Sequence, residues 1–199
     1  MGVALTLALL GWVGCDGGSA LQAMPRQVVL LRHGHKDVRR GDYNLSPQGL
    51  ARAIDLATLI PRCFGVPSQI RTYLLDPLSS KNARSYQTAV PLAVATGVNV
   101  GLVLDADTDS RGFGQRLLQD PQVDDRLVVL VWEHRRMPDL ARGLGWTTMA
   151  PIAADNFDDL FALRYDRNGL TQVEHYSQSE MLRLGCRSRL QPRPAPLHP

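Results

Sequence analysis

The segment Val28-Val29-Leu30-Leu31-Arg32-His33-Gly34 decides the fold, because an unbroken apolar run ends in an arginine, a histidine and a glycine. Short continuous apolar runs are typical of strands buried on both faces of a parallel sheet. A second such run, Leu127-Val128-Val129-Leu130-Val131-Trp132, is followed by Glu133 and His134. Ligands of open α/β sheets bind outside the carboxyl ends of the strands. We therefore predict that His33 and His134 belong to one site.

Strand-like and helix-like segments alternate along the rest of the chain. Helices are predicted over 46–63, 83–96, 105–119 and 137–144. Two more strands are predicted over 70–75 and 98–104, and a closing hairpin is predicted over 161–165 and 172–176. This alternation predicts an α/β fold, a three-layer sandwich with a mostly parallel central sheet flanked by helices.

The composition favours one domain and a small anionic ligand. The chain has 199 residues, of which 44% are hydrophobic, which is enough for a single ordinary core. The formal net charge of +3 is mild, and no run of Lys and Arg exceeds two residues. Nucleic acid is therefore not an expected partner, and a local anion site explains the basic bias as well.

The first 20 residues differ from the rest. Residues 1–14 are apolar and small, and Asp16 is the only charged residue before Arg26. Such a run is short for a membrane span but suits the core of a signal peptide. Gly14-Cys15 resembles a bacterial lipoprotein cleavage site, with a lipid anchor on Cys15. We expect a signal peptide or lipoprotein signal over 1–20 and an exported protein, periplasmic or lipid-anchored. A cytoplasmic protein whose start is assigned too early is the alternative.

The remaining two cysteines, Cys63 and Cys186, leave two possibilities open. Export permits a disulfide between them, and two unpaired thiols are the alternative. No CxxC spacing indicates a metal site. At the end of the chain, four prolines in the last ten residues predict a disordered tail over 186–199.

Arg84 adds a cation to the predicted site. It stands in Lys81-Asn82-Ala83-Arg84-Ser85-Tyr86-Gln87-Thr88-Ala89, near the start of a helix that follows another strand. Arginine binds phosphate through a planar fork of donors, and a helix N-terminus favours an anion. Together with Arg32, His33 and His134, Arg84 predicts a small anion-binding pocket.

Four blocks, in this order, resemble the histidine phosphatase superfamily, which has the phosphoglycerate mutase-like fold. They are the strand with Arg32-His33-Gly34, then Leu45-Ser46-Pro47-Gln48-Gly49, then Arg84-Ser85-Tyr86-Gln87-Thr88-Ala89, then Trp132-Glu133-His134. The similarity covers roughly residues 26 to 185, which we take as the histidine phosphatase domain. The form Arg32-His33-Gly34-His35-Lys36 resembles small bacterial members of uncharacterised substrate, whereas the glycolytic mutases usually carry Glu where His35 stands.

The resemblance implies phosphoryl transfer without a metal or another cofactor. It implies that His33 is the nucleophile and forms a phosphohistidine, and that Arg32, Arg84 and His134 hold the phosphoryl oxygens. A neutral ring nitrogen must face the phosphate, so an acceptor near His33 should fix its tautomer.

The proton donor is less well defined by the sequence. Asp107 is the first candidate because of its position after the third strand, and Glu133 is the second because it adjoins His134. Asp105 and Asp109 follow. The alternative for the acidic cluster is that it caps the helix after it. Arg52 lies on the polar face of its helix, and we interpret it as a surface residue.

The predicted activity is that of a histidine acid phosphatase-like hydrolase of phosphomonoesters, acting on a phosphorylated small molecule or a phosphoprotein. A phosphomutase of the same fold is the nearest alternative, but a mutase usually needs longer insertions than this chain has between Tyr86 and Glu133. A catalytically inactive module that binds a phospho-ligand or a protein is the third possibility. The absence of glutamate at position 35 keeps that reading open.

Overall fold

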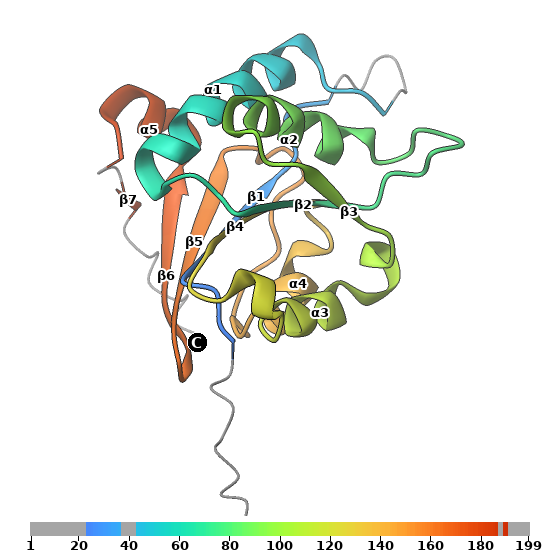
Figure 1. Ribbon diagram of the computed structural model, residues 1–199. Coiled ribbons are helices and arrows are strands. Elements are labelled where there is room, and N and C mark those ends of the chain that lie inside the picture. The colour runs from blue at the N-terminus through green and yellow to red at the C-terminus, as the bar shows by residue number, and fades with distance from the viewer. Residues whose placement is uncertain (1–22, 37–42, 187–188, 191–199) are drawn as a thin grey trace, which may run out of the picture.

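The computed structural model describes residues 23–36, 43–186 and 189–190, which form a seven-stranded sheet with helices on both faces (Figure 1). Along the sheet the strands are β3 (Val100–Val103), β2 (Gln69–Tyr73), β4 (Leu127–Trp132), β1 (Gln27–Arg32), β5 (Asp159–Asp166), β6 (Gly169–Ser177) and β7 (Arg189–Leu190). The first four strands are parallel, and β5, β6 and β7 pair antiparallel.

Five helices complete the three layers. Figure 1 shows α1 (Pro47–Phe64), α2 (Ala83–Thr96) and α5 (Gln178–Leu184) on one face, and α3 (Ala106–Leu117) and α4 (Met137–Gly143) on the other. A short 3-10 helix, Pro121–Val123, precedes β4. The predicted three-layer α/β sandwich is confirmed, with the parallel strands gathered in the half of the sheet that carries both strand-end histidines.

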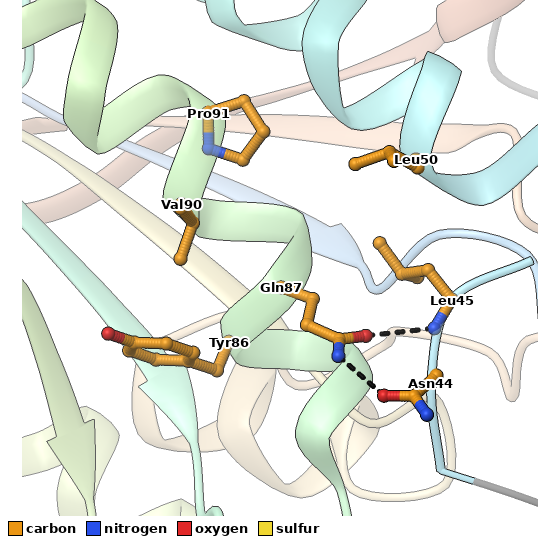
Figure 2. Close-up of a pocket in the computed structure, with 7 residues that line it drawn as sticks. All are labelled: Asn44, Leu45, Leu50, Tyr86, Gln87, Val90 and Pro91. Atoms are coloured by element: carbon orange, nitrogen blue, oxygen red, sulfur yellow. Dashed lines mark hydrogen bonds between the residues drawn. The ribbon is translucent and has the colours of Figure 1, made fainter. Parts of the chain in front are cut away.

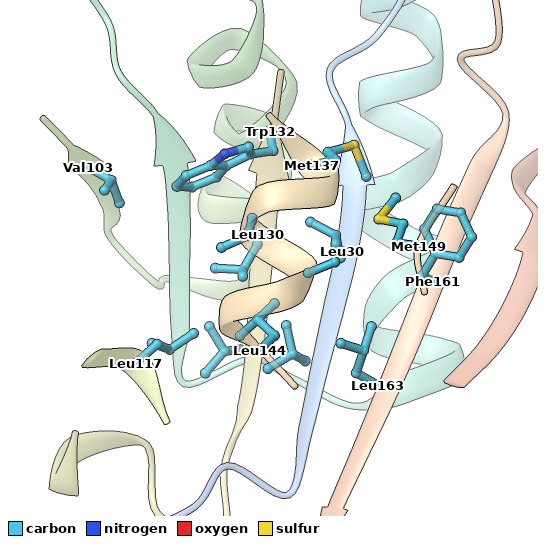
Figure 3. Packing of buried hydrophobic residues seen from close by; sticks show 14 of the residues in the cluster. Leu30, Val103, Leu117, Leu130, Trp132, Met137, Leu144, Met149, Phe161 and Leu163 are labelled. Atoms are coloured by element: carbon cyan, nitrogen blue, oxygen red, sulfur yellow. The ribbon is translucent and has the colours of Figure 1, made fainter. Parts of the chain in front are cut away.

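The two apolar runs of the sequence lie side by side at the centre of the sheet. β1 and β4 pair in register from Gln27 opposite Leu127 to Arg32 opposite Trp132, and every residue of both strands is buried. Successive side chains point to opposite faces of a sheet. Thus Leu30 packs in the cluster beneath α3 and α4, which Figure 3 shows around Met137, while Leu31 packs beneath α1 and α2. Burial on both faces explains why these runs are continuous rather than alternating.

Helix starts follow the local chemistry of the sequence. Ser46 caps α1, because its Oγ accepts a hydrogen bond of 3.1 Å from the amide of Gly49, and Pro47 occupies the first helical position. α2 begins at Ala83 and ends at Thr96, as predicted. Asn82, which precedes α2, adopts a left-handed conformation with φ of 66° and makes no side-chain cap.

The C-terminal part differs from the prediction. Cys63, in the last turn of α1, and Cys186, just after α5, form a disulfide across 123 residues. β7 then pairs with β6 at His175 and Tyr176. The prediction of a disordered tail over 186–199 is therefore wrong at its beginning, because the disulfide and the sheet hold residues that the composition alone marks as tail. Residues 191–199 lie outside the described residues.

Two further expectations concern the membrane. The predicted signal over 1–20, with Cys15, lies outside the described residues. Within the ranges that the structure covers, no helix is both long enough and apolar enough to cross a bilayer.

Candidate active site

β1 and β4 bring His33 and His134 to the same edge of the sheet. The ladder between the strands continues one residue beyond β1, because the amide of His33 donates to the carbonyl of Trp132 at 3.2 Å. Burial is the main cause that lowers the pKa of His33, and the charges of Arg32, Arg84 and His134 lower it further. The four residues predicted to bind and attack phosphate are thus brought together.

His33 is buried and held as a neutral ring. Only 4% of the residue is exposed, and burial is the main reason that its pKa falls to about 3. Its Nδ1 lies 2.8 Å from the carbonyl oxygen of Gly34. Because a carbonyl can only accept, Nδ1 carries the hydrogen and Nε2 keeps its lone pair. The expected acceptor that fixes the tautomer is therefore the backbone of the next residue.

Arg32 is fixed by a loop far away in the sequence. Its Nη1 donates to the carbonyls of Ala153, Ala154 and Asn156 at 3.2, 3.0 and 2.8 Å. Its Cζ lies 3.9 Å from the ring centroid of Phe157. Burial lowers the pKa of Arg32 to about 10. The Nε atom is buried and has no hydrogen-bond partner in the described part of the chain, so it is a donor available to an anion.

Glu133 and His134 follow β4, which pairs with β1 next to His33. The Nδ1 of His134 lies 2.8 Å from Oε1 of Glu133 without the alignment of a hydrogen bond. Burial lowers the pKa of His134, and the charge of Arg32 lowers it further. Glu133 is 8% exposed, and its two oxygens accept hydrogen bonds from the amide and the Nε of Arg135 at 2.9 and 3.0 Å. This carboxylate is therefore held in place beside the histidine.

Arg84 is connected to the loop that carries His33. It is the second residue of α2, and its carbonyl accepts a 2.7 Å hydrogen bond from Oγ1 of Thr88. The same Oγ1 accepts a 2.8 Å hydrogen bond from the amide of Gly34. Thr88 thus joins the first turns of α2 to the end of β1 and fixes Arg84 relative to His33.

Two glycines let α1 approach the same loop. A Cβ atom on Gly49 would lie 2.3 Å from the carbonyl oxygen of His35, and one on Gly34 would lie 2.9 Å from the carbonyl oxygen of Gly49. Ser46 adds a hydrogen bond of 2.9 Å from its amide to the carbonyl of His35. The first turn of α1 therefore supports the loop by direct backbone contact.

Asp107 lies in a different environment from Glu133. Its Oδ1 accepts hydrogen bonds from Tyr73 Oη at 2.5 Å and from Arg136 at 3.3 Å, and its side chain is 51% exposed. The hydrogen bond from Tyr73 is the main cause that lowers the pKa of Asp107. Burial raises the pKa of Tyr73, and the charge of Glu133 also acts on it. Of the two candidate proton donors, Asp107 is the one that Tyr73 binds directly.

The other two acidic candidates pair with one arginine. Asp105 and Asp109 accept from Arg116 at 2.6 and 2.9 Å, and all three side chains are about half exposed. Neither aspartate makes a side-chain cap at the start of α3, although Asp109 accepts a 2.8 Å hydrogen bond from the amide of Gly112 at a kink within the helix.

Arg52 and Phe157 were missed by the sequence reasoning. Arg52 is not a surface residue, because only 16% of its side chain is exposed and its Nη1 donates to Asp158 Oδ1 at 2.8 Å and to the carbonyl of Phe157 at 3.2 Å. The Phe157 ring lies 4.5 Å from the His35 ring and 5.9 Å from the His33 ring. A lone phenylalanine in the polar run Asp155-Asn156-Phe157-Asp158 was the available signal for this contact.

Among the described residues, no three His, Cys, Asp or Glu side chains gather in a way that suits a metal ion. Neither a protein-family model nor a curated protein sequence matches the chain.

Solved structures do match. A mycobacterial glucosyl-3-phosphoglycerate phosphatase is 19% identical, with a TM-score of 0.51 over 76% of this chain and 97% of that one. A phosphoserine phosphatase variant from Entamoeba histolytica, with phosphoserine bound, is 16% identical, with a TM-score of 0.51 over 74% and 95%. A candidate phosphohistidine phosphatase, SixA, from Agrobacterium tumefaciens is 18% identical, with a TM-score of 0.50 over 71% and 93%. At these identities the likeness establishes the fold, which is the one that the resemblance to the histidine phosphatase superfamily implied.

Proposed function

We propose that this chain is a metal-independent phosphatase that hydrolyses a phosphomonoester through a phosphohistidine on His33. The observation that carries the proposal is the neutral His33 ring, whose unprotonated Nε2 shares a buried site with Arg32, Arg84 and His134. The fold common to this chain and to several phosphatases supports it. The names of those proteins include a phosphorylated sugar acid and phosphoserine, and from them we take only the class of substrate, a phosphomonoester.

In the first step, Nε2 of His33 forms a bond to phosphorus while the bond from phosphorus to the ester oxygen breaks. The leaving oxygen takes a proton from a carboxylic acid of the protein. Arg32, Arg84 and His134 stabilise the charge on the phosphoryl oxygens, which is most valuable in the transition state. The partnerless Nε of Arg32 is the donor that we assign to one of these oxygens.

In the second step, water attacks phosphorus and the bond between phosphorus and Nε2 breaks. The carboxylate that gave its proton in the first step takes one from the attacking water. Inorganic phosphate leaves, and His33 returns to its neutral form with the hydrogen still on Nδ1, where Gly34 accepts it.

For the proton donor we place Glu133 first and Asp107 second, which reverses the order expected from the sequence. Glu133 is buried beside His134 within the site. Asp107 is half exposed, and its hydrogen bonds from Tyr73 and Arg136 favour the ionised form. A general acid must lie within reach of the leaving oxygen, and the burial of Glu133 beside His134 places it better for this than the half-exposed Asp107.

The test of the activity is hydrolysis of p-nitrophenyl phosphate with EDTA present, between about pH 4 and pH 8. We expect turnover by the wild type and a loss of roughly 100-fold or more in His33→Gln. No turnover by the wild type would overturn the proposal. Activity that survives in the variant would exclude His33 as the nucleophile, and transfer of the phosphoryl group to an added sugar acid in place of water would indicate a mutase.

The proton donor is tested by changing the leaving group. p-Nitrophenolate leaves without help from an acid, whereas an alkoxide needs a proton. We expect Glu133→Gln to lower kcat on an alkyl phosphate by about 100-fold and to affect p-nitrophenyl phosphate much less. Asp107→Asn, the matched control, should change kcat by the same factor on both substrates. The opposite pattern would make Asp107 the donor.

We also propose that the protein is exported. The disulfide between Cys63 and Cys186 supports this, because disulfides form and persist in oxidising compartments and are rare in the cytosol.

A further inference from the structure

A cavity of about 350 Å³ lies between the beginnings of α1 and α2 (Figure 2). Its volume lies in the range of cavities that hold small molecules. Seven residues line it: Asn44, Leu45, Leu50, Tyr86, Gln87, Val90 and Pro91.

The cavity adjoins the site that carries His33 and Arg84. Thr88, which hydrogen-bonds to the amide of Gly34, is the next residue after Gln87 in the cavity wall. Ser46, whose amide bonds to the carbonyl of His35, is the next residue after Leu45. The cavity is therefore lined by sequence neighbours of Thr88 and Ser46, the two residues that hold the loop after His33 from α2 and from the segment before α1.

Tyr43 provides a third connection between the cavity and the phosphate-binding residues. The ring of Tyr43 lies 6.0 Å from Cζ of Arg84, and Tyr43 is followed directly by Asn44 of the cavity. A ligand whose phosphate reaches Arg84 can therefore extend toward the cavity.

Hydrogen bonds hold one wall of the cavity in place, and most of its lining is apolar. Gln87 holds the segment before α1, since its Nε2 donates to Asn44 Oδ1 at 2.7 Å and its Oε1 accepts from the amide of Leu45 at 2.8 Å, as Figure 2 shows. Apolar side chains form most of the remaining wall, and two of them, Leu50 and Tyr86, are 50% and 36% exposed. Apolar surface left open next to a ligand site marks a place for another apolar group.

We propose that this cavity is a subsite for the apolar part of the substrate, an alkyl or aryl group attached to the phosphate that His33 attacks. The inference rests on the proposed function and narrows its substrate class to phosphomonoesters with one charged and one apolar end. In this proposal Arg32 and Arg84 would hold the phosphate, and Leu45, Leu50 and Val90 would contact the apolar part of the ligand.

The test measures inhibition by n-alkylphosphonates from ethyl to octyl, against hydrolysis of p-nitrophenyl phosphate. Phosphonates are not hydrolysed, so differences between leaving groups do not enter. Each methylene that leaves water for an apolar cavity should lower Ki by about threefold to fourfold until the cavity is full. A Ki that does not change with chain length would overturn the subsite and leave the phosphatase proposal intact.

Two matched variants locate the effect. Leu50→Gln places an amide in the cavity wall, and Ile54→Gln makes the same change one turn later on α1, at a residue that is 55% exposed and does not line the cavity. We expect Leu50→Gln to raise the Ki of octylphosphonate about tenfold and to leave the Ki of inorganic phosphate unchanged. Ile54→Gln should change neither Ki. Equal Ki values in the two variants would overturn the proposal. It would also be overturned if Leu50→Gln altered the oligomeric state, measured as the molecular mass in solution, and left the Ki of octylphosphonate unchanged.

The subsite and the proposed function can fail separately. If the wild type does not hydrolyse p-nitrophenyl phosphate, the proposed function fails. The same phosphonates are then titrated by calorimetry, where tighter binding of the longer chains would support the cavity as an apolar subsite, and equal binding would overturn it.

Discussion

His33 owes its chemical state to neighbours from several parts of the chain. The next residue, Gly34, accepts its Nδ1 hydrogen, whereas the charges that lower its pKa come from Arg32, Arg84 and His134. The sequence itself shows that Arg32, His33 and Gly34 are adjacent at the end of the strand. The carbonyls that hold Arg32 lie 121, 122 and 124 residues away, and no local pattern encodes contacts over that separation. The sequence thus predicted the reactive groups but not what orients them.

The lowered pKa of His33 predicts a pH dependence of stability. The pKa is about 3 in the folded state and near 6.5 in the unfolded chain. Between these values the unfolded state binds a proton that the folded state does not, so stability falls as the pH drops from 6.5 toward 3. The loss is at most about 1.4 kcal/mol per pH unit.

Urea unfolding of the wild type and of His33→Gln at about pH 7 and pH 4.5 measures this contribution. The variant should lose less stability than the wild type on acidification, because it lacks the contribution of His33. His35 and His134 are present in both proteins and contribute equally. An equal loss in the two proteins would show that His33 is not held neutral by burial.

At the level of elements, the site depends on how closely α1 and the 153–159 segment approach the loop after β1. The N-cap at Ser46 and the proline at position 47 made the start of α1 predictable. The segment that holds Arg32 was not predictable, because it is neither helical nor extended before Asp159 and shows no periodicity. It is held by side chains instead: Arg52 binds Asp158, which also accepts from the amide of Ser179 at 2.9 Å.

Gly49→Ala tests the backbone contact of α1. In an open helix this substitution stabilises by about 1 kcal/mol, since alanine is the better helix former. Here the added Cβ would lie 2.3 Å from the carbonyl oxygen of His35, so we expect a destabilisation of about 1 to 3 kcal/mol and lower activity. Ala51→Ser, at an exposed position on the same helix, is the control for thermal unfolding and turnover. A stabilised, fully active Gly49→Ala protein would refute the contact.

Arg52→Met tests the clamp on Phe157 and Asp158. Loss of the ion pair should loosen the segment whose carbonyls orient Arg32, so we expect kcat to fall about tenfold, with a smaller change in KM. Arg52→Lys should recover part of the loss, because a lysine can still pair with the carboxylate. Arg62→Met, in the last turn of α1, serves as the control. If both methionine variants lose kcat equally, Arg52 has no specific role in positioning.

Across the whole molecule, the parallel half of the sheet was predictable and the C-terminal half only in part. Buried parallel strands have a clear signature, and the turn at 166–169 identified the hairpin of β5 and β6. β7 is only two residues long and carries no readable period, and α5 was not predicted from the sequence. The pairing of Cys63 with Cys186 depends on the closed fold, which brings their Cα atoms to 5.0 Å.

The disulfide closes a long loop, so its loss should destabilise the protein. The chain-entropy model gives about 5 kcal/mol for a loop of this length, and loss of a native disulfide typically costs about 2 to 5 kcal/mol. We expect Cys63→Ser and Cys186→Ser to lower Tm by similar amounts, and the double variant to be no worse than either. A reducing agent should lower Tm in the wild type and leave the variants unchanged. If the reducing agent did not change the Tm of the wild type, this would argue against the disulfide.

His33 is the residue that we propose to carry the phosphoryl group. Rapid acid-free quenching of the wild type with p-nitrophenyl phosphate, followed by peptide mass spectrometry, tests it most directly. We expect one phosphoryl group on the peptide that contains His33, labile in acid and absent from His33→Gln. A turnover-competent enzyme with no phosphorylated intermediate, or with the phosphoryl group on another residue, would contradict it.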